Sequence, residues 1–164
     1  MELSKKITEA NALHLTDNYI MKRTLVALLI LATLTSCNST DLYEDVITNY
    51  ENGNRKEVRY YQVNKDGSKT WVRETWYYME GMKHLDGPIA NDKRNGNFET
   101  YYKSGNLMST GLFVDGIREG KAVVYYENGN IHYEGNYKNG KECGIWKFYR
   151  EDGKLIEEIN RDLR

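Results

Sequence analysis

The C-terminal half of this 164-residue chain repeats itself every 24 residues, and this period constrains the fold more than any other feature. Three sets of residues recur in step: Gly96, Gly120 and Gly144; Gly105, Gly129 and Gly153; and Tyr101, Tyr125 and Tyr149. A unit this short cannot enclose its own hydrophobic core, so neighbouring copies must bury apolar surface against each other. The sequence therefore predicts a repeat protein, which presents a long surface rather than a deep catalytic cleft.

Turn dipeptides mark the ends of the predicted strands. From residue 50 onward, pairs such as Asn128-Gly129 and Asn139-Gly140 recur at intervals of 11 to 14 residues over much of the chain, and such pairs accept the positive φ angles of tight hairpins. The segments between them are rich in Tyr, Val, Ile and Phe, as strands are. We predict an all-β fold over residues 50–160, an elongated antiparallel meander of stacked β-hairpins with about four and a half copies of the unit. The interval from Gly53 to Gly81 exceeds one period by four residues, so a bulge or longer turn is expected near residues 64–67.

Alternation along the strands predicts which side chains share a face. One face should carry Phe98, Ala122 and Trp146, and we interpret it as the packing face. The opposite face should carry Tyr101, Tyr125 and Tyr149, with Met108, His132 and Glu134 from the following strands. Rows of exposed aromatic rings can anchor a partner, although sheet tyrosines more often pack across strands. These three tyrosines are the candidate partner-binding residues.

No motif in the sequence predicts catalysis, a cofactor or a metal site. Acidic residues form no recurring pair in an apolar setting, as tuned acid and base catalysis would need. The run from Gly135 to Glu142 nearly matches a phosphate-binding loop, but it lacks the hydroxyl after Lys141 and no helix is predicted to follow. His84 and His132 lie two periods apart, so strand spacing separates them far beyond zinc-ligand distances. We expect a non-enzymatic protein, and a formal net charge of −1 gives no reason to expect a nucleic-acid partner.

A targeting segment is predicted ahead of the repeats. A basic start at Met21 is followed by an apolar run over 25–34 and by the sequence Leu-Thr-Ser-Cys ending at Cys37. The run has about half the length of a membrane-spanning helix, so a helical signal-peptide core fits better. The pattern resembles a bacterial lipoprotein signal, which implies cleavage after Ser36 and acylation of Cys37. Membrane anchoring in the cell envelope follows from that resemblance.

The rest of the N-terminal region divides into two further parts. Residues 1–20 carry mixed charges unlike a signal peptide, and we expect them to be an upstream extension that is not translated, with synthesis starting at Met21. Residues 37–49 are polar and acidic, so they are predicted to be a tether without strand structure. Asn38 differs from the acidic residue that retains some lipoproteins in the inner membrane, which favours the outer membrane. Acylation of Cys37 would leave Cys143 without a disulfide partner.

Segments of the last copies resemble the bacterial MORN-repeat variant. The resemblance is carried by the stretches YYENGN at 125–130, EGNYKNGK at 134–141 and GIWKFY at 144–149. It implies a twisted sheet of stacked hairpins that makes protein or membrane contacts and has no shared catalytic residues. Many bacterial members are labelled as YwqK-like antitoxin components.

Three functions remain open on these observations. The first is a lipid-anchored envelope protein whose repeat sheet is an interaction surface for an unknown protein. The second, suggested only by the family label, is an antitoxin or immunity-type partner of a toxin. The third is a binder of envelope polymer or glycan, because aligned aromatic rings can stack on sugars. Nothing in the sequence identifies the partner.

Overall fold

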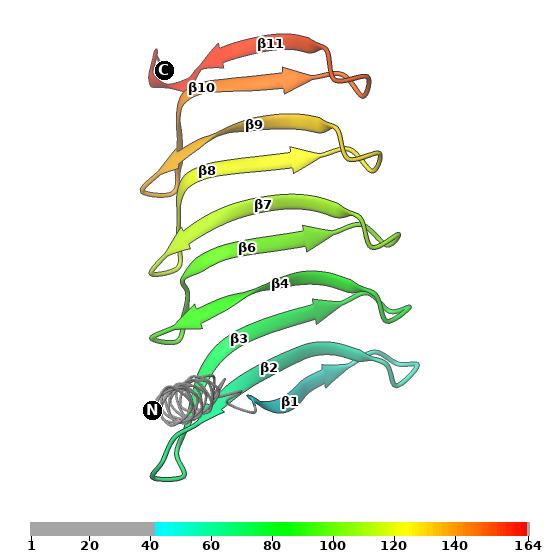
Figure 1. Ribbon diagram of the computed structural model, residues 1–164, viewed down its shortest axis with the longest axis vertical. Helices are drawn as coiled ribbons and strands as arrows, with labels where there is room; N and C mark the ends of the chain where they lie inside the picture. The colour runs from blue at the N-terminus through cyan, green and yellow to red at the C-terminus, as the bar shows by residue number, and fades with distance from the viewer. Residues whose placement is uncertain (1–41, 164) are drawn as a thin grey trace, which may run out of the picture. The chain divides into compact units, whose positions relative to one another are not determined.

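The computed structural model describes residues 42–163, which form one open antiparallel sheet. The strands follow each other in chain order from one edge to the other, as Figure 1 shows, except the two-residue β5, which pairs only with β4. The upstream extension 1–20, the signal peptide 21–36 and Cys37 lie outside the described residues. The all-β meander predicted from the sequence is confirmed. Its elements are β1 (Leu42–Asn49), β2 (Arg55–Val63), β3 (Lys69–Tyr77), β4 (Lys83–Ala90), β5 (Lys93–Arg94), β6 (Gly96–Tyr101), β7 (Leu107–Val114), β8 (Ile117–Tyr125), β9 (Ile131–Lys138), β10 (Lys141–Tyr149), β11 (Leu155–Asn160) and the short 3-10 helix η1 (Arg161–Leu163).

Two kinds of turn alternate between the two sides of the sheet (Figure 1). On one side, five-residue turns such as Tyr102–Asn106 are closed by the Gly105 N–H donating to the Tyr102 carbonyl at 2.9 Å, with Gly105 at φ 90°. On the other side, two-residue turns have positive φ at the first residue, as at Asp115 (48°) and Asn139 (52°). Both types match the turn chemistry that the sequence indicated.

Two turns depart from the sequence expectation. The β2–β3 connection is a five-residue turn, Asn64–Ser68, on the side where two-residue turns otherwise occur. This confirms the longer turn predicted near residues 64–67. The turn at Asn91-Asp92, between β4 and β5, was not predicted because it lacks glycine, yet both residues adopt positive φ (51° and 57°). Asn and Asp tolerate this conformation better than other non-glycine residues.

The predicted packing face is confirmed by its buried rings. Phe98 and Trp146 are only 4% and 2% exposed, and each lies flat against a glycine on the neighbouring strand. A Cβ atom added to Gly135 would lie 2.2 Å from the Trp146 ring, and one added to Gly87 would lie 2.4 Å from the Phe98 ring. Such a ring-on-glycine contact buries the ring against the backbone of the neighbouring strand, so this face buries apolar surface without a second sheet packed on it.

The opposite face is held together mainly by polar contacts. Asp86 is 3% exposed and accepts hydrogen bonds from Arg73 Nε at 2.7 Å, from Lys83 Nζ at 2.7 Å and from Thr75 Oγ1 at 2.9 Å. Burial raises the pKa of Asp86, but the bonds from Arg73, Lys83 and Thr75 outweigh it and leave the pKa below its ordinary value. The carboxylate therefore stays charged and ties β3 to β4.

The tether predicted for residues 37–49 is wrong for Leu42–Asn49, which form β1. This strand pairs with β2 through a register that includes Val46 opposite Val58. Its own residues alternate poorly, because Glu44 and Asp45 are adjacent and seven of the eight positions are exposed. The strand forms because β2 offers a free edge, and a pattern search within 42–49 cannot detect that partner.

β-Bulges also correct part of the predicted face assignment. The register between β6 and β7 shifts between the pairs Thr100–Ser109 and Tyr101–Leu107, which leaves Met108 unpaired and places it beside Thr100 on the packing face. The corresponding shift in β9 leaves His132 unpaired, and its ring packs 4.3 Å from that of Tyr126. His132 is therefore half-buried rather than directed at solvent. Glu134 lies on the opposite face as predicted, in an ion pair with Lys121 at 2.8 Å.

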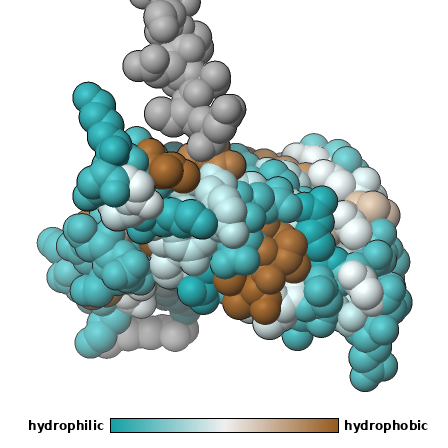
Figure 2. All heavy atoms as spheres, turned by 90° about the horizontal axis from the view of Figure 1, so that it is seen from below, coloured by the Kyte–Doolittle hydropathy of each residue, from teal (hydrophilic) through white to brown (hydrophobic). Residues whose placement is uncertain are grey.

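The two outer strands, β1 and β11, are free along one edge within residues 42–163. Figure 2 views the sheet from the end that carries β1 and β2, and it shows hydrophobic patches set in a largely hydrophilic surface. Exposed apolar side chains lie on both outer strands: Leu42, Tyr43, Val46 and Ile47 on β1, and Leu155 and Ile156 on β11. Acidic side chains stand beside them on both strands, a common means of discouraging edge-to-edge association.

Candidate binding groove

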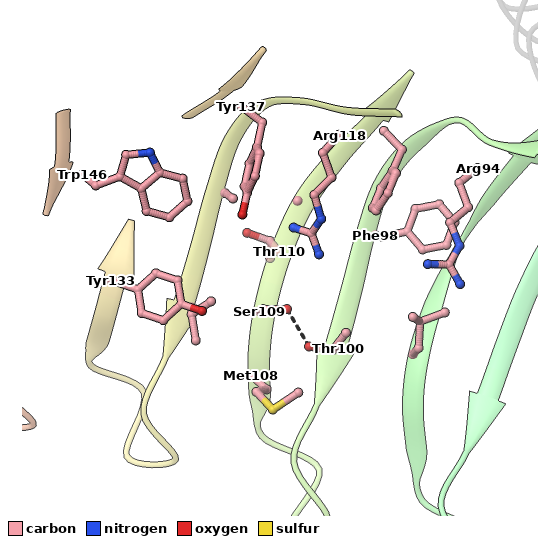
Figure 3. A pocket seen from close by; sticks show the side chains of 15 residues that line it. Arg94, Phe98, Thr100, Met108, Ser109, Thr110, Arg118, Tyr133, Tyr137 and Trp146 are labelled. Atoms are coloured by element: carbon pink, nitrogen blue, oxygen red, sulfur yellow. Dashed lines mark hydrogen bonds between the residues drawn. The ribbon is translucent and has the colours of Figure 1, made fainter. Parts of the chain in front are cut away.

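A groove of about 300 Å³ crosses the packing face over the middle copies of the repeat (Figure 3). Its side chains come from strands β4 to β10, so no single repeat forms it. We refer to this site as the groove. It is lined by Leu85, Arg94, Phe98, Thr100, Met108, Ser109, Thr110, Gly111, Phe113, Arg118, Ala122, Val124, Tyr133, Tyr137 and Trp146.

The groove exists because one copy of the repeat carries a small residue where its neighbours carry rings. Phe98, Ala122 and Trp146 occupy equivalent positions 24 residues apart. Phe98 covers Gly87 and Trp146 covers Gly135, whereas nothing covers Gly111 in the same way. A Cβ atom added to Gly111 would meet only Arg118 Nη1, at 3.5 Å. The missing ring at position 122 leaves the space between the two covered glycines.

Arginine and aromatic side chains alternate along one wall of the groove. The Arg94 guanidinium carbon lies 5.7 Å from the Phe113 ring centre. The guanidinium carbon of Arg118 lies 5.3 Å from that ring and 5.3 Å from the ring of Tyr137. Figure 3 shows Arg118 beside Tyr137, above the polar middle of the groove. The stack of cation and ring follows the 24-residue period, because Arg94 and Arg118 are equivalent residues.

The charges of this stack are balanced everywhere except at Arg118. Arg94 donates from Nε to Glu74 Oε1 at 2.6 Å. In the last copy the equivalent position is Glu142, and it pairs with Arg161 at 2.9 Å. Arg118 has neither a hydrogen-bond nor an ion-pair partner for its guanidinium among residues 42–163. The groove lining contains two arginines and no Asp or Glu.

A cluster of large rings continues the lining from Tyr137. The Tyr137 and Trp146 rings meet edge to face at 5.3 Å, and the Tyr133 ring lies 6.1 Å from that of Trp146. Trp146 Nε1 is buried and has no hydrogen-bond partner in the described part of the chain. Burial raises the pKa of the Tyr137 hydroxyl, and the nearby Arg118 charge lowers it less. The net shift is upward, so this hydroxyl stays protonated and can donate.

Hydroxyl groups line the middle of the groove. Thr100 Oγ1 and Ser109 Oγ lie 2.6 Å apart on β6 and β7, and the dashed line in Figure 3 marks this bond. The groove thus combines hydroxyl groups, flat rings and an unbalanced cation. Within residues 42–163, no group of three or more potential metal-ligating side chains is found.

The predicted column of Tyr101, Tyr125 and Tyr149 lies on the other face of the sheet, and all three residues are half-buried. The Tyr149 hydroxyl donates to Glu134 Oε1 at 3.0 Å, and the Tyr101 hydroxyl donates to Glu99. Burial first, and then the bond to Glu99, raises the pKa of Tyr101 to about 12. Two of the three hydroxyls are therefore engaged within the sheet. A partner-binding role for this column stays a prediction.

The sequence did not predict a binding site on the packing face, although Phe98, Ala122 and Trp146 were assigned to that face. A signal was present, because Arg94 and Arg118 are one period apart and so are Phe113 and Tyr137. The hollow at Ala122 could also be read from its place between Phe98 and Trp146. The pairing of Arg94 with Glu74 could not be predicted in this way, because that contact joins a regular copy of the repeat to the irregular segment before it.

No helix in the described part of the chain is long and apolar enough to span a membrane. Two family models match the sequence. The MORN repeat variant matches three times, at residues 94–115, 118–139 and 142–162. The prokaryotic membrane lipoprotein lipid attachment site matches residues 21–38, a segment that includes Cys37.

Comparisons with whole proteins add little. No curated protein matches the chain. Among solved structures, the crystal structure of TarM aligns with a TM-score of 0.46 and 16% sequence identity, over 82% of this chain and 24% of that one. The chain thus spans about a quarter of the length of that structure.

Proposed function

This chain carries three MORN repeat variants behind a prokaryotic lipoprotein attachment site, and from that premise we propose that it binds a partner through the groove. In this proposal the protein is a non-enzymatic, lipid-anchored component of the bacterial cell envelope. Cys37 holds it at the membrane, and the packing face of the sheet is the recognition surface. The observation that supports the proposal most directly is the hollow left by Ala122 between Phe98 and Trp146.

The groove is better suited to recognition than the tyrosine column. Recognition sites combine apolar rings with a few unpaired polar groups that fix orientation. The groove has both, since the rings of Tyr133 and Tyr137 line it and the Arg118 guanidinium lacks a partner in the described residues. On the other face, the hydroxyl groups of Tyr101 and Tyr149 already donate hydrogen bonds within the sheet.

The lipid anchor would keep the first strand of the sheet near the membrane. Only residues 38–41 separate Cys37 from the start of β1 at Leu42. A fully extended chain spans at most 3.3–3.6 Å per residue, so this linkage reaches no farther than about 18 Å. A partner located in the envelope therefore fits better than one that acts in the cytoplasm.

The proposal is tested by filling the hollow. Ala122→Phe would place a third ring over Gly111, as Phe98 and Trp146 already cover Gly87 and Gly135. The processed, lipidated protein would be crosslinked in living cells and its adducts compared between this variant and Ile145→Phe. Ile145 is 51% exposed on the other face of the sheet, so it is a matched control.

We expect Ala122→Phe to lose the adducts that the wild type and Ile145→Phe share. Equal adducts in all three proteins would contradict a role for the groove. Adducts lost only in Ile145→Phe would assign binding to the other face. Turnover of an envelope substrate by the purified protein, abolished by a groove substitution, would overturn the non-enzymatic part of the proposal.

A further inference from the structure

We propose that the groove recognises an acidic sugar, a glycan unit bearing a carboxylate or phosphate group, with Arg118 as the residue that binds the anion. This inference rests on the binding role of the groove and names the chemistry of its ligand. Three features of the site support it. The Arg118 guanidinium has no ion-pair partner among residues 42–163, hydroxyl groups line the middle of the groove, and its aromatic rings lie on strands that have no free edge.

The charge of the groove calls for an anion. Its lining includes no carboxylate, and of its two arginines Arg94 is already neutralised by Glu74 at 2.6 Å. Arg118 is held between the rings of Phe113 and Tyr137, at 5.3 Å from each ring centre. Its Nη1 lies over Gly111, 3.5 Å from where a Cβ atom would stand, and its N–H groups have no partner among residues 42–163. Those donors match the paired oxygens of a carboxylate or phosphate.

The surroundings of Arg118 favour a sugar over a peptide. The strands beneath it, β6 to β9, are each paired on both sides, so an extended peptide cannot add a strand there. The rings of Phe98 and Trp146 are buried, which leaves no deep apolar pocket for a peptide side chain. Thr100, Ser109 and Tyr133 instead present hydroxyl groups to the groove. A shallow, hydroxyl-lined site beside flat rings suits a polyhydroxylated ring.

The size of the groove agrees with a short glycan unit. Its volume of about 300 Å³ lies at the lower end of small-ligand sites. The hollow spans the place of one missing ring, between the Phe98 and Trp146 positions. A ligand of this size would contact Arg118, whose guanidinium lies over Gly111.

The test measures binding of defined probes to the processed protein in detergent micelles, by calorimetry at low and high salt. Trigalacturonic acid supplies carboxylates on sugars, and its methyl ester is the same glycan without charge. Glucose 6-phosphate and glucose form the corresponding phosphate pair. Inorganic phosphate alone and triglutamate represent an anion without a sugar and an acidic peptide.

We expect one charged sugar to bind at least about tenfold more tightly than its neutral counterpart, a ratio typical of a charge-assisted hydrogen bond. Which of the two pairs shows this ratio identifies the anion as carboxylate or phosphate. Arg118→Gln should remove the preference, and Arg118→Lys should retain part of it. Arg150→Ala is the control, because Arg150 lies in the last turn of the sheet, outside the groove lining, and pairs with Asp152.

Several results would overturn the inference. Equal binding of charged and neutral sugars would do so, as would an Arg118→Gln variant that keeps the full preference while melting at the wild-type temperature. Triglutamate binding as tightly as the sugars would reassign the site to acidic peptides, and inorganic phosphate binding as tightly would leave no role for the sugar ring. If Ala122→Phe removes cellular adducts and no charged sugar binds, the ligand class is wrong and the binding role of the groove stands.

Discussion

The Tyr102 hydroxyl donates a hydrogen bond of 2.6 Å to the backbone carbonyl of Tyr125, which lies 23 residues later in the chain. The same contact occurs in the three other copies that begin their turn with tyrosine, at 2.8 to 2.9 Å: from Tyr50 to Tyr77, from Tyr78 to Tyr101 and from Tyr126 to Tyr149. A second series runs beside it, in which the last residue of a five-residue turn donates to the next turn: Asn54 to Met79, Asn106 to Glu127 and Asn130 to Glu151. These two series connect each five-residue turn on this side of the sheet to the following one on the same side.

Tyr102→Phe should destabilise the sheet by about 1 kcal/mol, because the Tyr125 carbonyl loses a donor that no other side chain replaces. The measurement is the free energy of unfolding from urea denaturation. Tyr43→Phe serves as the control, since the Tyr43 side chain is 43% exposed on the outer strand β1. A loss no greater in Tyr102→Phe than in Tyr43→Phe would show that the recurring bond adds nothing to stability.

Gly135→Ala should destabilise the protein by about 2 kcal/mol or more, because the new Cβ would lie 2.2 Å from the Trp146 ring and displace it. Gly111→Ala, at the equivalent position one copy earlier, should cost far less because the nearest atom there is 3.5 Å away. The melting temperatures of the two variants provide the comparison. Similar melting temperatures would contradict the ring-on-glycine packing.

Ala122→Phe should leave the melting temperature unchanged or raise it, because no ring covers Gly111 and only the end of the flexible Arg118 side chain has to move aside for the new ring. Burial of a phenylalanine ring contributes about 2 kcal/mol when no neighbour is displaced, although crowding in a packed core would offset it. A large fall in melting temperature would mean that the hollow at position 122 is smaller than the structure shows. This measurement also establishes that the variant is folded before its binding is interpreted.

The Asp86 carboxylate should make stability fall in acid. Its pKa in the folded protein is below the ordinary value, so its contribution is complete above about pH 4 and is lost as the pH falls through the folded pKa. Asp86→Asn should lower the free energy of unfolding at pH 7 by about 1 to 3 kcal/mol, since Arg73 and Lys83 lose their charged partner. It should also flatten the decline of stability between pH 4 and about pH 2.

Comparing the stability of Asp86→Asn and the wild type at acid pH shows whether Asp86 causes the loss of stability there. If Asp86→Asn and the wild type lose stability in parallel below pH 4, another carboxylate accounts for the acid sensitivity. Asp115→Asn is the matched control at pH 7, because Asp115 is exposed in a two-residue turn with positive φ, a conformation that Asn accepts.

Cys37→Ser should abolish lipid attachment and release the protein from the membrane fraction. Thioether formation requires the Cys37 sulfur, and more than one acyl chain is needed for stable anchoring. Metabolic labelling with a fatty-acid analogue and detergent partitioning measure the two effects. Cys143→Ser should behave as the wild type, and equal labelling of Cys37→Ser would place the lipid elsewhere.

The turns and the packing face could be predicted because their causes are local. Gly105 and Gly129 adopt positive φ through turn chemistry that a few neighbouring residues specify. Phe98 and Trp146 follow from alternation with a two-residue period. The copies also repeat, so each prediction in one unit was supported by the next.

The elements that escaped prediction depend on partners distant in the sequence. The strand β1 forms on the edge of β2, and its adjacent Glu44 and Asp45 hide the alternation. Met108 moved to the other face because a bulge in β7 shifts the register there. The groove itself depends on the difference between copies at Ala122, whereas the sequence analysis relied on what the copies share.

The hydrogen bonds that pass from one turn to the next have a consequence for how such a chain can change in evolution. Each copy is aligned by its immediate neighbours alone, and no closure condition fixes how many copies there are. Gain of one whole 24-residue unit would add two strands and lengthen the sheet by about 10 Å. The span of the molecule can therefore grow or shrink in whole steps by duplication or deletion, while the chemistry at any one copy is altered separately by point substitution.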